Sequence, residues 1–189
     1  MSFDLSVIPN KNILLAVTGG IAAYKSAILV RRLKDAGFQV RVVMTEGAQA
    51  FITPLTFQAL SGNPVHTELL DPEAEAGMGH IELARWADLL LVAPASCNTI
   101  AKFAAGLADD LLSTLYLATK APVWVAPAMN QQMWAAKATQ RNLATLVEDG
   151  VHVIMPDAGA QACGDVGLGR MPEPEDLAHQ VTEYFHKAQ

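Results

Sequence analysis

Short apolar runs alternate with helical stretches along this sequence, and this alternation limits the folds that the chain can adopt. The runs lie at residues 13–17, 40–44, 89–93, 123–126 and 151–155. Such runs are typical of strands that are buried on both faces. The segments between neighbouring runs are long enough for helical crossovers, which connect parallel strands with a right-handed sense. The pattern therefore predicts an open parallel sheet covered by helices.

The alternation continues through most of the chain without an internal repeat or a linker. With 189 residues, of which 51% are hydrophobic, the chain is large enough for one sizeable core. We expect residues 1–189 to form one α/β domain with a flavodoxin-like or Rossmann-like three-layer fold. Two stretches look irregular, residues 71–79 and the Gly-rich segment 157–174. A loop as long as the second one is usually functional or disordered.

Charge and composition argue against several kinds of protein. Thirteen Lys and Arg against nineteen Asp and Glu leave a net charge of −6, which disfavours nucleic-acid binding because phosphate contacts need clustered cations. No apolar run is long enough to span a membrane, and the first residues do not resemble a secretory signal, so we expect a cytoplasmic protein. Cys97 and Cys163 lack the paired spacing of a zinc site, and no metal site is predicted.

Two turns are suited to a phosphorylated cofactor. With a flavodoxin-like strand order, the turns after the first and third runs flank the point where the strand order reverses, and ligands bind there. Gly19 and Gly20 lie in the first turn, and the second carries Ser96, Asn98 and Thr99. The same residues also suit a tight turn and a helix cap, so both interpretations stay open. The absence of G-x-G-x-x-G and P-loop patterns favours a mononucleotide.

Three further residues have side chains that suit catalysis. His80 begins a short helical run, where the positive helix end favours the neutral imidazole that accepts a proton; a surface or capping histidine is the alternative. Asn130 lies at a strand-to-helix turn, where it either caps the helix or donates its amide to a carboxylate. Cys163 lies in the Gly-rich segment, and its thiol is suited to giving a proton to a carbanion.

Several motifs together resemble one protein family. They are Gly19-Gly20-Ile21, Gly79-His80, APASCNTIAKFAAGLADDLL at residues 93–112, P-x-M-N-x-x-M-W at 127–134, and A-C-G-D-x-G-x-G-R-M at 162–171. Residues 12–171 are similar to the homo-oligomeric flavin-containing cysteine decarboxylases, and most closely to the phosphopantothenoylcysteine decarboxylases of coenzyme A biosynthesis. One departure is Cys97, where the family pattern predicts alanine, and a thiol of similar size should not disturb the turn.

The resemblance implies FMN as the cofactor and a role for each motif. His80 would act as the base, Asn130 would hold the substrate carboxylate, and Cys163 would protonate the decarboxylated intermediate. The flavin site would be lined by Gly19, Gly20, Ile21, Thr45, Ser96, Cys97, Asn98, Thr99 and Ala128. A clamp at about 157–174 would close over the substrate with Ala162, Gly164, Asp165, Gly167, Gly169, Arg170 and Met171. Of these, Arg170 is our candidate for binding an anionic group.

The implied reaction converts 4′-phosphopantothenoylcysteine into 4′-phosphopantetheine. Loss of CO₂ from an ordinary cysteine carboxylate would leave an unsupported carbanion. Oxidation of the thiol-bearing carbon by FMN gives a thioaldehyde, which delocalises the charge as an enethiolate; a proton from Cys163 and return of the hydride complete the reaction. The family also implies a trimer or dodecamer with flavin sites at subunit contacts. In many bacteria such a decarboxylase is fused to phosphopantothenoylcysteine synthetase, so this chain is either a free-standing enzyme or the N-terminal half of such a fusion.

Other functions stay open at this point. A decarboxylase of C-terminal peptide cysteines shares the histidine and the P-x-M-N-x-x-M-W pattern, although the pattern at 162–171 favours the pantothenoyl substrate. A flavin prenyltransferase has a related architecture but should lack the cysteine-bearing clamp. Outside the enzymes, a non-catalytic FMN-binding protein is disfavoured by the joint presence of His80, Asn130 and Cys163. A structural α/β module without a cofactor is the last alternative.

Overall fold

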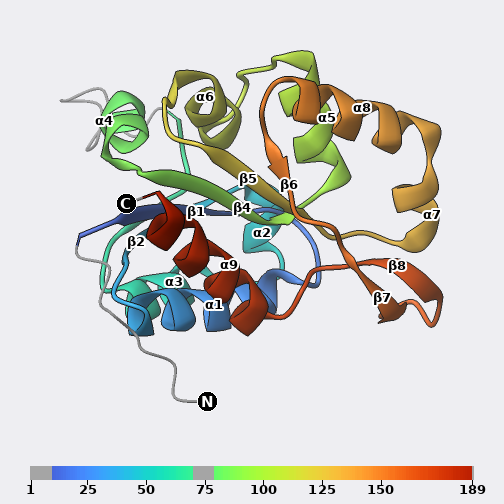
Figure 1. Ribbon diagram of the computed structural model, residues 1–189, viewed down its shortest axis with the longest axis horizontal. Helices are drawn as coiled ribbons and strands as arrows, with labels where there is room; N and C mark the ends of the chain where they lie inside the picture. Colours follow the sequence, from blue (N-terminus) through green and yellow to red (C-terminus); the bar gives the residue numbers. More distant parts are fainter. Residues whose placement is uncertain (1–9, 70–78, 189) are drawn as a thin grey trace.

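The structure is a computed structural model that describes residues 10–69 and 79–188, and its centre is a parallel sheet (Figure 1). In the described residues the sheet has six strands in the order β3-β2-β1-β4-β5-β6. The strands are β1 (Asn12–Val17), β2 (Gln39–Met44), β3 (Val65–His66), β4 (Leu89–Ala95), β5 (Val123–Pro127) and β6 (His152–Val153). The prediction of an open parallel sheet with flavodoxin-like order is confirmed.

The edge strand β3 is the one strand of this sheet that the sequence analysis did not count. It has only two residues, Val65 and His66, which are too few to produce an apolar run. They pair with Val42 and Val43 of β2. At the opposite edge, β6 is shorter than the predicted run at 151–155. Both differences concern sheet edges, where backbone pairing on one side decides the length of a strand.

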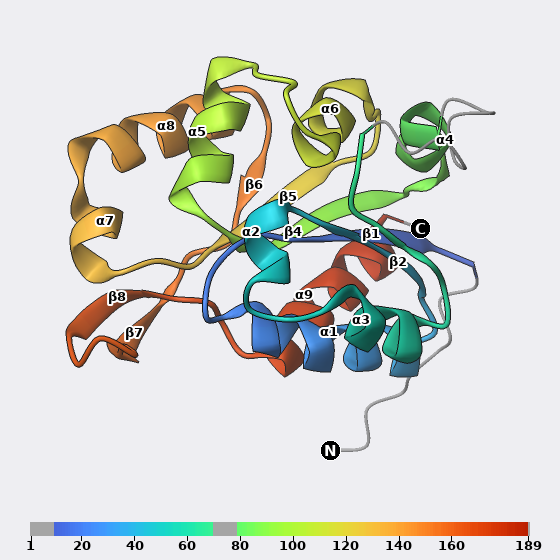
Figure 2. The ribbon, with the colours of Figure 1, turned by 180° about the vertical axis from the view of Figure 1, so that it is seen from behind.

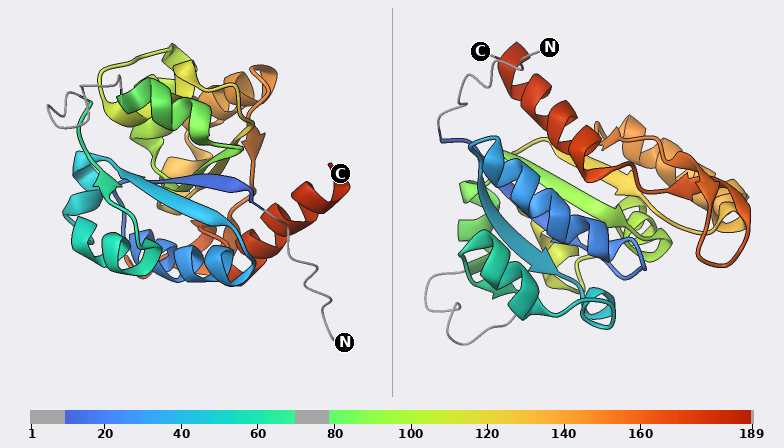
Figure 3. Two further views of the ribbon diagram at one scale, coloured as in Figure 1. Left: turned by 90° about the vertical axis from the view of Figure 1, so that its left-hand side faces the viewer. Right: turned by 90° about the horizontal axis from the view of Figure 1, so that it is seen from below.

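Helices cover both faces of the sheet (Figures 1 and 2). On one face lie α1 (Ala23–Asp35), α3 (Pro54–Ser61) and α9 (Pro174–Lys187), and on the other α4 (Gly79–Trp86), α5 (Cys97–Ala105), α6 (Leu111–Ala118) and α8 (Lys137–Glu148). Figure 3 shows α1 and α9 side by side beneath the sheet. The short helices α2 (Glu46–Gln49) and α7 (Gln131–Ala135) follow β2 and β5. No helix in 10–69 or 79–188 is long and apolar enough to cross a membrane.

The segment between β2 and β3 contains two helices. The first, α2, ends at Gln49, and α3 starts at Pro54. Proline disfavours the helical conformation in the residue before it, and Thr53 is extended with φ −84° and ψ 150°. The break at Pro54 is therefore a local consequence of the sequence.

The side chains of the apolar runs pack into two cores, one on each side of the sheet. Along β1, Ile13, Leu15 and Val17 pack toward α1 and α9. Leu14 and Ala16 point the other way and pack toward α5, α6 and α8. Successive side chains of a strand point to opposite faces, so a strand buried on both sides must be apolar throughout. This explains why these strands read as continuous apolar runs.

Part of the Gly-rich segment is regular, so its description as an irregular loop is wrong. β7 (Asp157–Ala160) and β8 (Val166–Arg170) form an antiparallel hairpin outside the main sheet. Gly159 pairs with Gly167, so the hairpin rests on backbone pairing without the alternating apolar side chains that reveal a strand. In the other stretch predicted as irregular, residues 71–78 lie outside the described residues, and Gly79 begins α4.

Candidate active site

The turns after β1 and β4 are joined directly by Thr18. Its hydroxyl donates to the Pro94 carbonyl over 2.7 Å and accepts from the Ser96 N–H over 2.9 Å. The Thr18 side chain is buried. Sequence analysis assigned Thr18 no role, because its two partners are far away in the chain. The contact holds together the two turns that flank the reversal of strand order, where ligands bind in such sheets.

The two glycines of the first turn serve different purposes. A Cβ on Gly19 would lie 3.0 Å from the carbonyl carbon of Gly47, so two backbones pack directly against each other there. A Cβ on Gly20 would meet no heavy atom of the described residues within 4 Å. Ile21 beside it is 62% exposed. Gly19 is therefore needed for packing, whereas open space lies beside Gly20 at the ligand-binding edge.

The turn after β4 caps α5. The Ser96 hydroxyl accepts from the Thr99 N–H over 3.2 Å and lies 3.2 Å from the Thr99 hydroxyl. Thr99 is buried and Asn98 is exposed. The Cys97 side chain lies against Met129, with its Sγ 3.0 Å from Met129 Sδ. The capping interpretation thus holds for Ser96, and the exposed Asn98 stays available to a ligand.

The other predicted flavin residues also lie at strand ends. The Thr45 N–H donates to the Val17 carbonyl over 3.1 Å, which ties the turn after β2 to β1. The Ala128 N–H donates to the Ala95 carbonyl over 3.1 Å, which ties the turn after β5 to β4. The predicted set lies at the carboxyl ends of β1, β2, β4 and β5, and it includes the Thr45, Ser96 and Thr99 hydroxyls and the Asn98 amide. This neutral donor set fits a phosphorylated cofactor that approaches backbone and helix N-termini.

Asn130 connects α7 with the β7–β8 hairpin. Its Oδ1 accepts from the Gln132 N–H over 2.8 Å, which caps α7. Its Nδ2 donates to Asp165 Oδ2 over 2.8 Å and contacts Cys163 Sγ at 3.2 Å. The capping interpretation of Asn130 is therefore confirmed, and the free end of its amide donates to a carboxylate of its own chain, that of Asp165. Asn130 thus forms a cluster at the carboxyl end of β5 with Cys163 and Asp165, which lie 33 and 35 positions further along the chain.

The β7–β8 hairpin forms most of the segment predicted as a clamp and is called the clamp hairpin below. It lies against the turn after β5. The Met129 N–H donates to the Gly169 carbonyl over 2.9 Å. Gly169 has φ +136°, and a Cβ there would collide with the Met129 carbonyl. A Cβ on Gly167 would likewise collide with the Gln131 side chain. Glycine at these two positions therefore allows the hairpin to approach the site so closely, whereas Ala162 and Gly164 lie exposed in its turn.

Charged residues anchor the base of the clamp. The ammonium group of Lys25, in the first turn of α1, donates to the Met171 carbonyl over 2.9 Å and to Glu173 Oε1 over 2.7 Å. Lys25 and Met171 are buried. Arg170 lies 3.6 Å from the same Glu173 oxygen, so in this conformation it pairs with an anion of its own chain. Lys25 was missed by sequence analysis because its partners lie in the C-terminal part of the chain.

His80 lies apart from the other predicted catalytic residues. It is in the first turn of α4, as predicted, and α4 packs against α6. Figures 1 and 2 place α4 and the β7–β8 hairpin at opposite ends of the molecule. Within the described residues, the buried Nδ1 of His80 has no hydrogen-bond partner. One chain therefore brings together Asn130, Cys163 and Asp165 but not His80.

A family model described as Flavoprotein matches residues 4–186. The chain belongs to the Flavoprotein family. The coenzyme A biosynthesis bifunctional protein CoaBC of Vibrio parahaemolyticus is 59% identical to this flavoprotein over 181 residues, which is 96% of the chain and 45% of the relative. The chain therefore spans less than half of the length of this relative.

Solved structures match the flavoprotein over nearly its whole length. A cysteine-to-serine variant of PPC decarboxylase complexed with pantothenoylaminoethenethiol is 35% identical, with a TM-score of 0.82, and the match covers 94% of this chain and 99% of that one. The FMN-dependent cysteine decarboxylase SpaF is 32% identical, with a TM-score of 0.79, over 94% of this chain and 97% of that one. These matches agree with the three-layer α/β fold.

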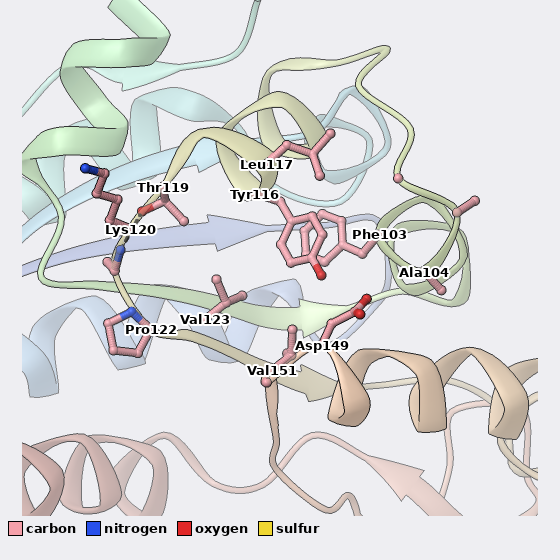
Figure 4. A pocket seen from close by; sticks show the side chains of 14 residues that line it. Phe103, Ala104, Tyr116, Leu117, Thr119, Lys120, Pro122, Val123, Asp149 and Val151 are labelled. Carbon is pink, nitrogen blue, oxygen red and sulfur yellow. Dashed lines mark hydrogen bonds between the residues drawn. The ribbon is translucent and has the colours of Figure 1, made fainter.

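A separate hollow of about 710 Å³ lies away from the candidate site of this flavoprotein (Figure 4). It is formed where α5 and α6 end and β5 begins. The rings of Phe103 and Tyr116 stack there with centroids 4.0 Å apart. Burial, and to a smaller extent the charge of Asp149, raise the pKa of Tyr116. None of the predicted site residues lines this hollow.

Proposed function

We propose that this flavoprotein uses FMN to convert 4′-phosphopantothenoylcysteine into 4′-phosphopantetheine, a step of coenzyme A biosynthesis. The observation that carries the proposal is the contact of Asn130 with Cys163 and Asp165 at the carboxyl end of β5. The relative named for coenzyme A biosynthesis and the solved PPC decarboxylase support the reaction. The FMN-dependent decarboxylase SpaF supports the cofactor.

FMN would be held at the carboxyl ends of β1, β2, β4 and β5. The residues that we propose for this role are Gly19, Gly20, Ile21, Thr45, Ser96, Cys97, Asn98, Thr99 and Ala128. When bound, FMN supplies the two-electron oxidation of the thiol-bearing carbon of the substrate and returns those electrons at the end. The chain itself supplies positions, hydrogen bonds and protons.

Asn130 holds the carboxylate that is lost. Its Oδ1 is fixed by the N–H of Gln132, so its Nδ2 is directed at the hairpin. In the structure this Nδ2 donates to the carboxylate of Asp165. A substrate carboxylate would take the place of that acceptor, and a neutral amide binds it without stabilising the charge so strongly that CO₂ loss is hindered.

Cys163 delivers the proton to the carbon that has lost CO₂. Its thiol is exposed, lies 3.2 Å from Asn130 Nδ2, and donates toward Asp165 Oδ2 over 3.6 Å. Cys163 lies next to the Asn130 amide that would hold the departing carboxylate. Its thiol can therefore reach the carbon to which this carboxylate is attached. Proton donation by a positioned side chain is worth about 10² to 10⁴ in rate.

His80 acts from a second copy of the chain in this proposal. Its distance from the Asn130–Cys163 cluster in one chain requires a partner if it is the base. Exposed apolar side chains suited to such a contact follow β1 and β2: Ile21, Tyr24, Phe51 and Leu55 are 55–72% exposed. Exposed apolar patches of this kind mark contact surfaces. We propose a homo-oligomer, a trimer or a dodecamer, in which His80 completes the site of a neighbour.

The proposed domain is residues 1–189, with the clamp at about 157–174. The chain covers 45% of its bifunctional CoaBC relative, which supports the proposal that it is the decarboxylase half of a fusion with phosphopantothenoylcysteine synthetase. The substrate is a small metabolite, and we propose a cytoplasmic enzyme.

A visible spectrum and a product assay test this function. We expect purified protein to show the absorption of oxidised flavin, and to release CO₂ from 4′-phosphopantothenoylcysteine with 4′-phosphopantetheine detected by mass spectrometry. A peptide with a C-terminal cysteine serves as the alternative substrate. Release of CO₂ from the peptide alone would assign the chain to peptide decarboxylation. Flavin-loaded protein that leaves both substrates untouched would indicate a non-catalytic flavoprotein, and colourless protein that takes up no FMN would contradict the proposal.

A further inference from the structure

Gln161 closes the turn of the clamp hairpin that contains Cys163. Its N–H donates to the Asp165 carbonyl over 2.8 Å, and its own carbonyl accepts from the Gly164 N–H over 2.9 Å. Cys163 lies inside this closed turn. The backbone of Gln161 therefore restricts where the Cα of Cys163 can lie, even though the turn is on the surface of the protein.

The side-chain amide of Gln161 ties this turn to the helix that follows Asn130. Its Oε1 accepts from the N–H of Gln131, the first residue of α7, over 3.0 Å. N–H groups of the first helical turn have no partner within the helix. The Asn130 side chain accepts from the next N–H, that of Gln132. Because Gln161 and Asn130 accept from consecutive N–H groups at the start of α7, the positions of their side chains are linked.

The other end of the same amide fastens the hairpin. Nε2 of Gln161 donates to the Leu168 carbonyl of β8 over 3.2 Å and lies 3.4 Å from the Met129 carbonyl. One side chain therefore contacts the hairpin strand β8, the turn after β5 and the start of α7. An amide can do this because it offers two donors and two acceptor sites.

The oxygen of this amide also faces the proposed proton donor. Cys163 Sγ lies 3.8 Å from Gln161 Oε1, on the same side as the Asp165 carboxylate and the Asn130 amide. A thiol has one proton and is a weak donor. Asp165 Oδ2 is the nearer acceptor at 3.6 Å, and Gln161 Oε1 adds a second, neutral acceptor, so the thiol is held between the two.

We propose that Gln161 is a positioning residue that holds the Cys163 thiol against Asn130 for protonation of the decarboxylated intermediate; this inference rests on the proposed function. In that step the S–H bond breaks and a C–H bond forms at the carbon that has lost CO₂. The thiolate left on Cys163 takes its next proton from water. Loss of CO₂ precedes this step, so a displaced thiol slows protonation but not decarboxylation. A displacement of about 1 Å costs about 10²-fold in rate.

The partition between two products tests the role of Gln161. We compare Gln161→Ala with Gln132→Ala. Gln132 lies in α7, next to Gln131, and its exposed side-chain amide has no hydrogen-bond partner among the described residues. Mass spectrometry gives the ratio of the oxidised enethiol to 4′-phosphopantetheine. CO₂ release is measured in a single turnover per bound flavin, because a released enethiol leaves two electrons on the flavin. For Gln161→Ala we expect the ratio to rise about tenfold or more while CO₂ release stays within about threefold. Gln132→Ala should keep the wild-type ratio.

The ratio does not depend on the amount of folded enzyme, so a purely structural defect leaves it unchanged. An unchanged ratio in a Gln161→Ala enzyme that still releases CO₂ overturns the proposal. If this variant does not fold, Gln161→Glu supplies the same test. It keeps the acceptor for the Gln131 N–H but loses the donors to the Leu168 and Met129 carbonyls, and it should raise the ratio as well.

Alkylation of Cys163 tests the positioning without substrate. Peptide mapping follows the reaction of this thiol with iodoacetamide in the flavin-loaded protein. We expect Gln161→Ala to react about threefold faster or more, because the thiol loses a neighbour that restrains it, and Gln132→Ala to react like the wild type. An equal rate in Gln161→Ala contradicts the positioning role. Wild-type protein that releases no CO₂ contradicts the proposed function instead, and the alkylation rates still decide about Gln161.

Discussion

At the scale of single residues, the proposed chemistry depends on the thiol of Cys163. We predict that Cys163→Ser retains FMN and CO₂ release but accumulates the oxidised enethiol, because a serine hydroxyl is a far weaker acid than a thiol. Formation of 4′-phosphopantetheine should fall by about 10² or more. Mass spectrometry of the products measures both species. Full conversion to 4′-phosphopantetheine by the variant would remove Cys163 from the proton-donor role.

Among the structural elements, the clamp hairpin depends on Gly169 for its approach to the turn after β5. We predict that Gly169→Ala breaks the hydrogen bond from the Met129 N–H, because a Cβ would collide with the Met129 carbonyl and φ is +136°. Hydrogen exchange of the Met129 amide should accelerate, and kcat/KM should fall about tenfold or more.

Gly164→Ala is the matched control for Gly169→Ala. Gly164 also has a left-handed φ of +91°, but a Cβ there meets nothing within 4 Å among the described residues. It should therefore carry the backbone strain of about 1 to 3 kcal/mol without exposing the Met129 amide. Equal protection of that amide in Gly169→Ala and wild-type protein would show that the hairpin adapts without losing the contact.

Another element, α6, begins with a cap that makes stability depend on pH. Asp110 Oδ1 accepts from the Ser113 N–H over 2.7 Å, and Lys102 donates to Asp110 Oδ2 over 2.7 Å. Burial alone would raise the pKa of Asp110, but the hydrogen bonds from Lys102 and Ser113 outweigh it and lower the pKa. A lowered pKa in the folded state contributes stability above the ordinary carboxyl pKa, and this contribution is lost as the pH falls through the folded-state value.

We predict that Asp110→Asn lowers the free energy of unfolding by about 1 kcal/mol at pH 7. The difference from wild type should shrink as the pH falls below about 4. Denaturant titrations at both pH values measure this. Asp109→Asn is the control, because its carboxylate also binds Lys102 but is 60% exposed, and a surface ion pair is worth about 1 kcal/mol or less. A difference that is the same at both pH values would contradict the assignment.

At the scale of the whole molecule, His80 and Cys163 lie too far apart in one chain to act on the same substrate, so the proposed site needs residues from two chains. When each variant is expressed alone, we expect both His80→Asn and Cys163→Ser to form 4′-phosphopantetheine more slowly than the wild type. If the two residues act across a subunit contact, co-expression of both variants produces some sites with an intact His80 and an intact Cys163, about a quarter for random equal mixing. We expect 4′-phosphopantetheine formation to recover to that extent. No recovery in mixed oligomers, whose size light scattering establishes, would mean that both residues must come from one chain.

The sequence by itself determined the layered α/β fold, the place of its main strands and helices, and the two turns that flank the reversal of strand order. These follow from local patterns: a strand buried on both faces must be apolar throughout, and Ser96 and Pro54 act on their immediate neighbours. Residue types at motif positions also indicated Asn130 and Cys163. Local patterns do not report contacts between distant segments.

Tertiary structure decided which of these residues meet. The Asn130 amide reaches Cys163 and Asp165 only because the β7–β8 hairpin folds back over the turn after β5. The hairpin itself was not predicted, because backbone pairing between glycines leaves no apolar periodicity. Sequence analysis also missed Thr18, Lys25 and Gln161, because each acts on partners that only the packed chain brings near. The place of His80, at the far end of the molecule from Cys163, likewise follows from the topology of the sheet and not from any local signal.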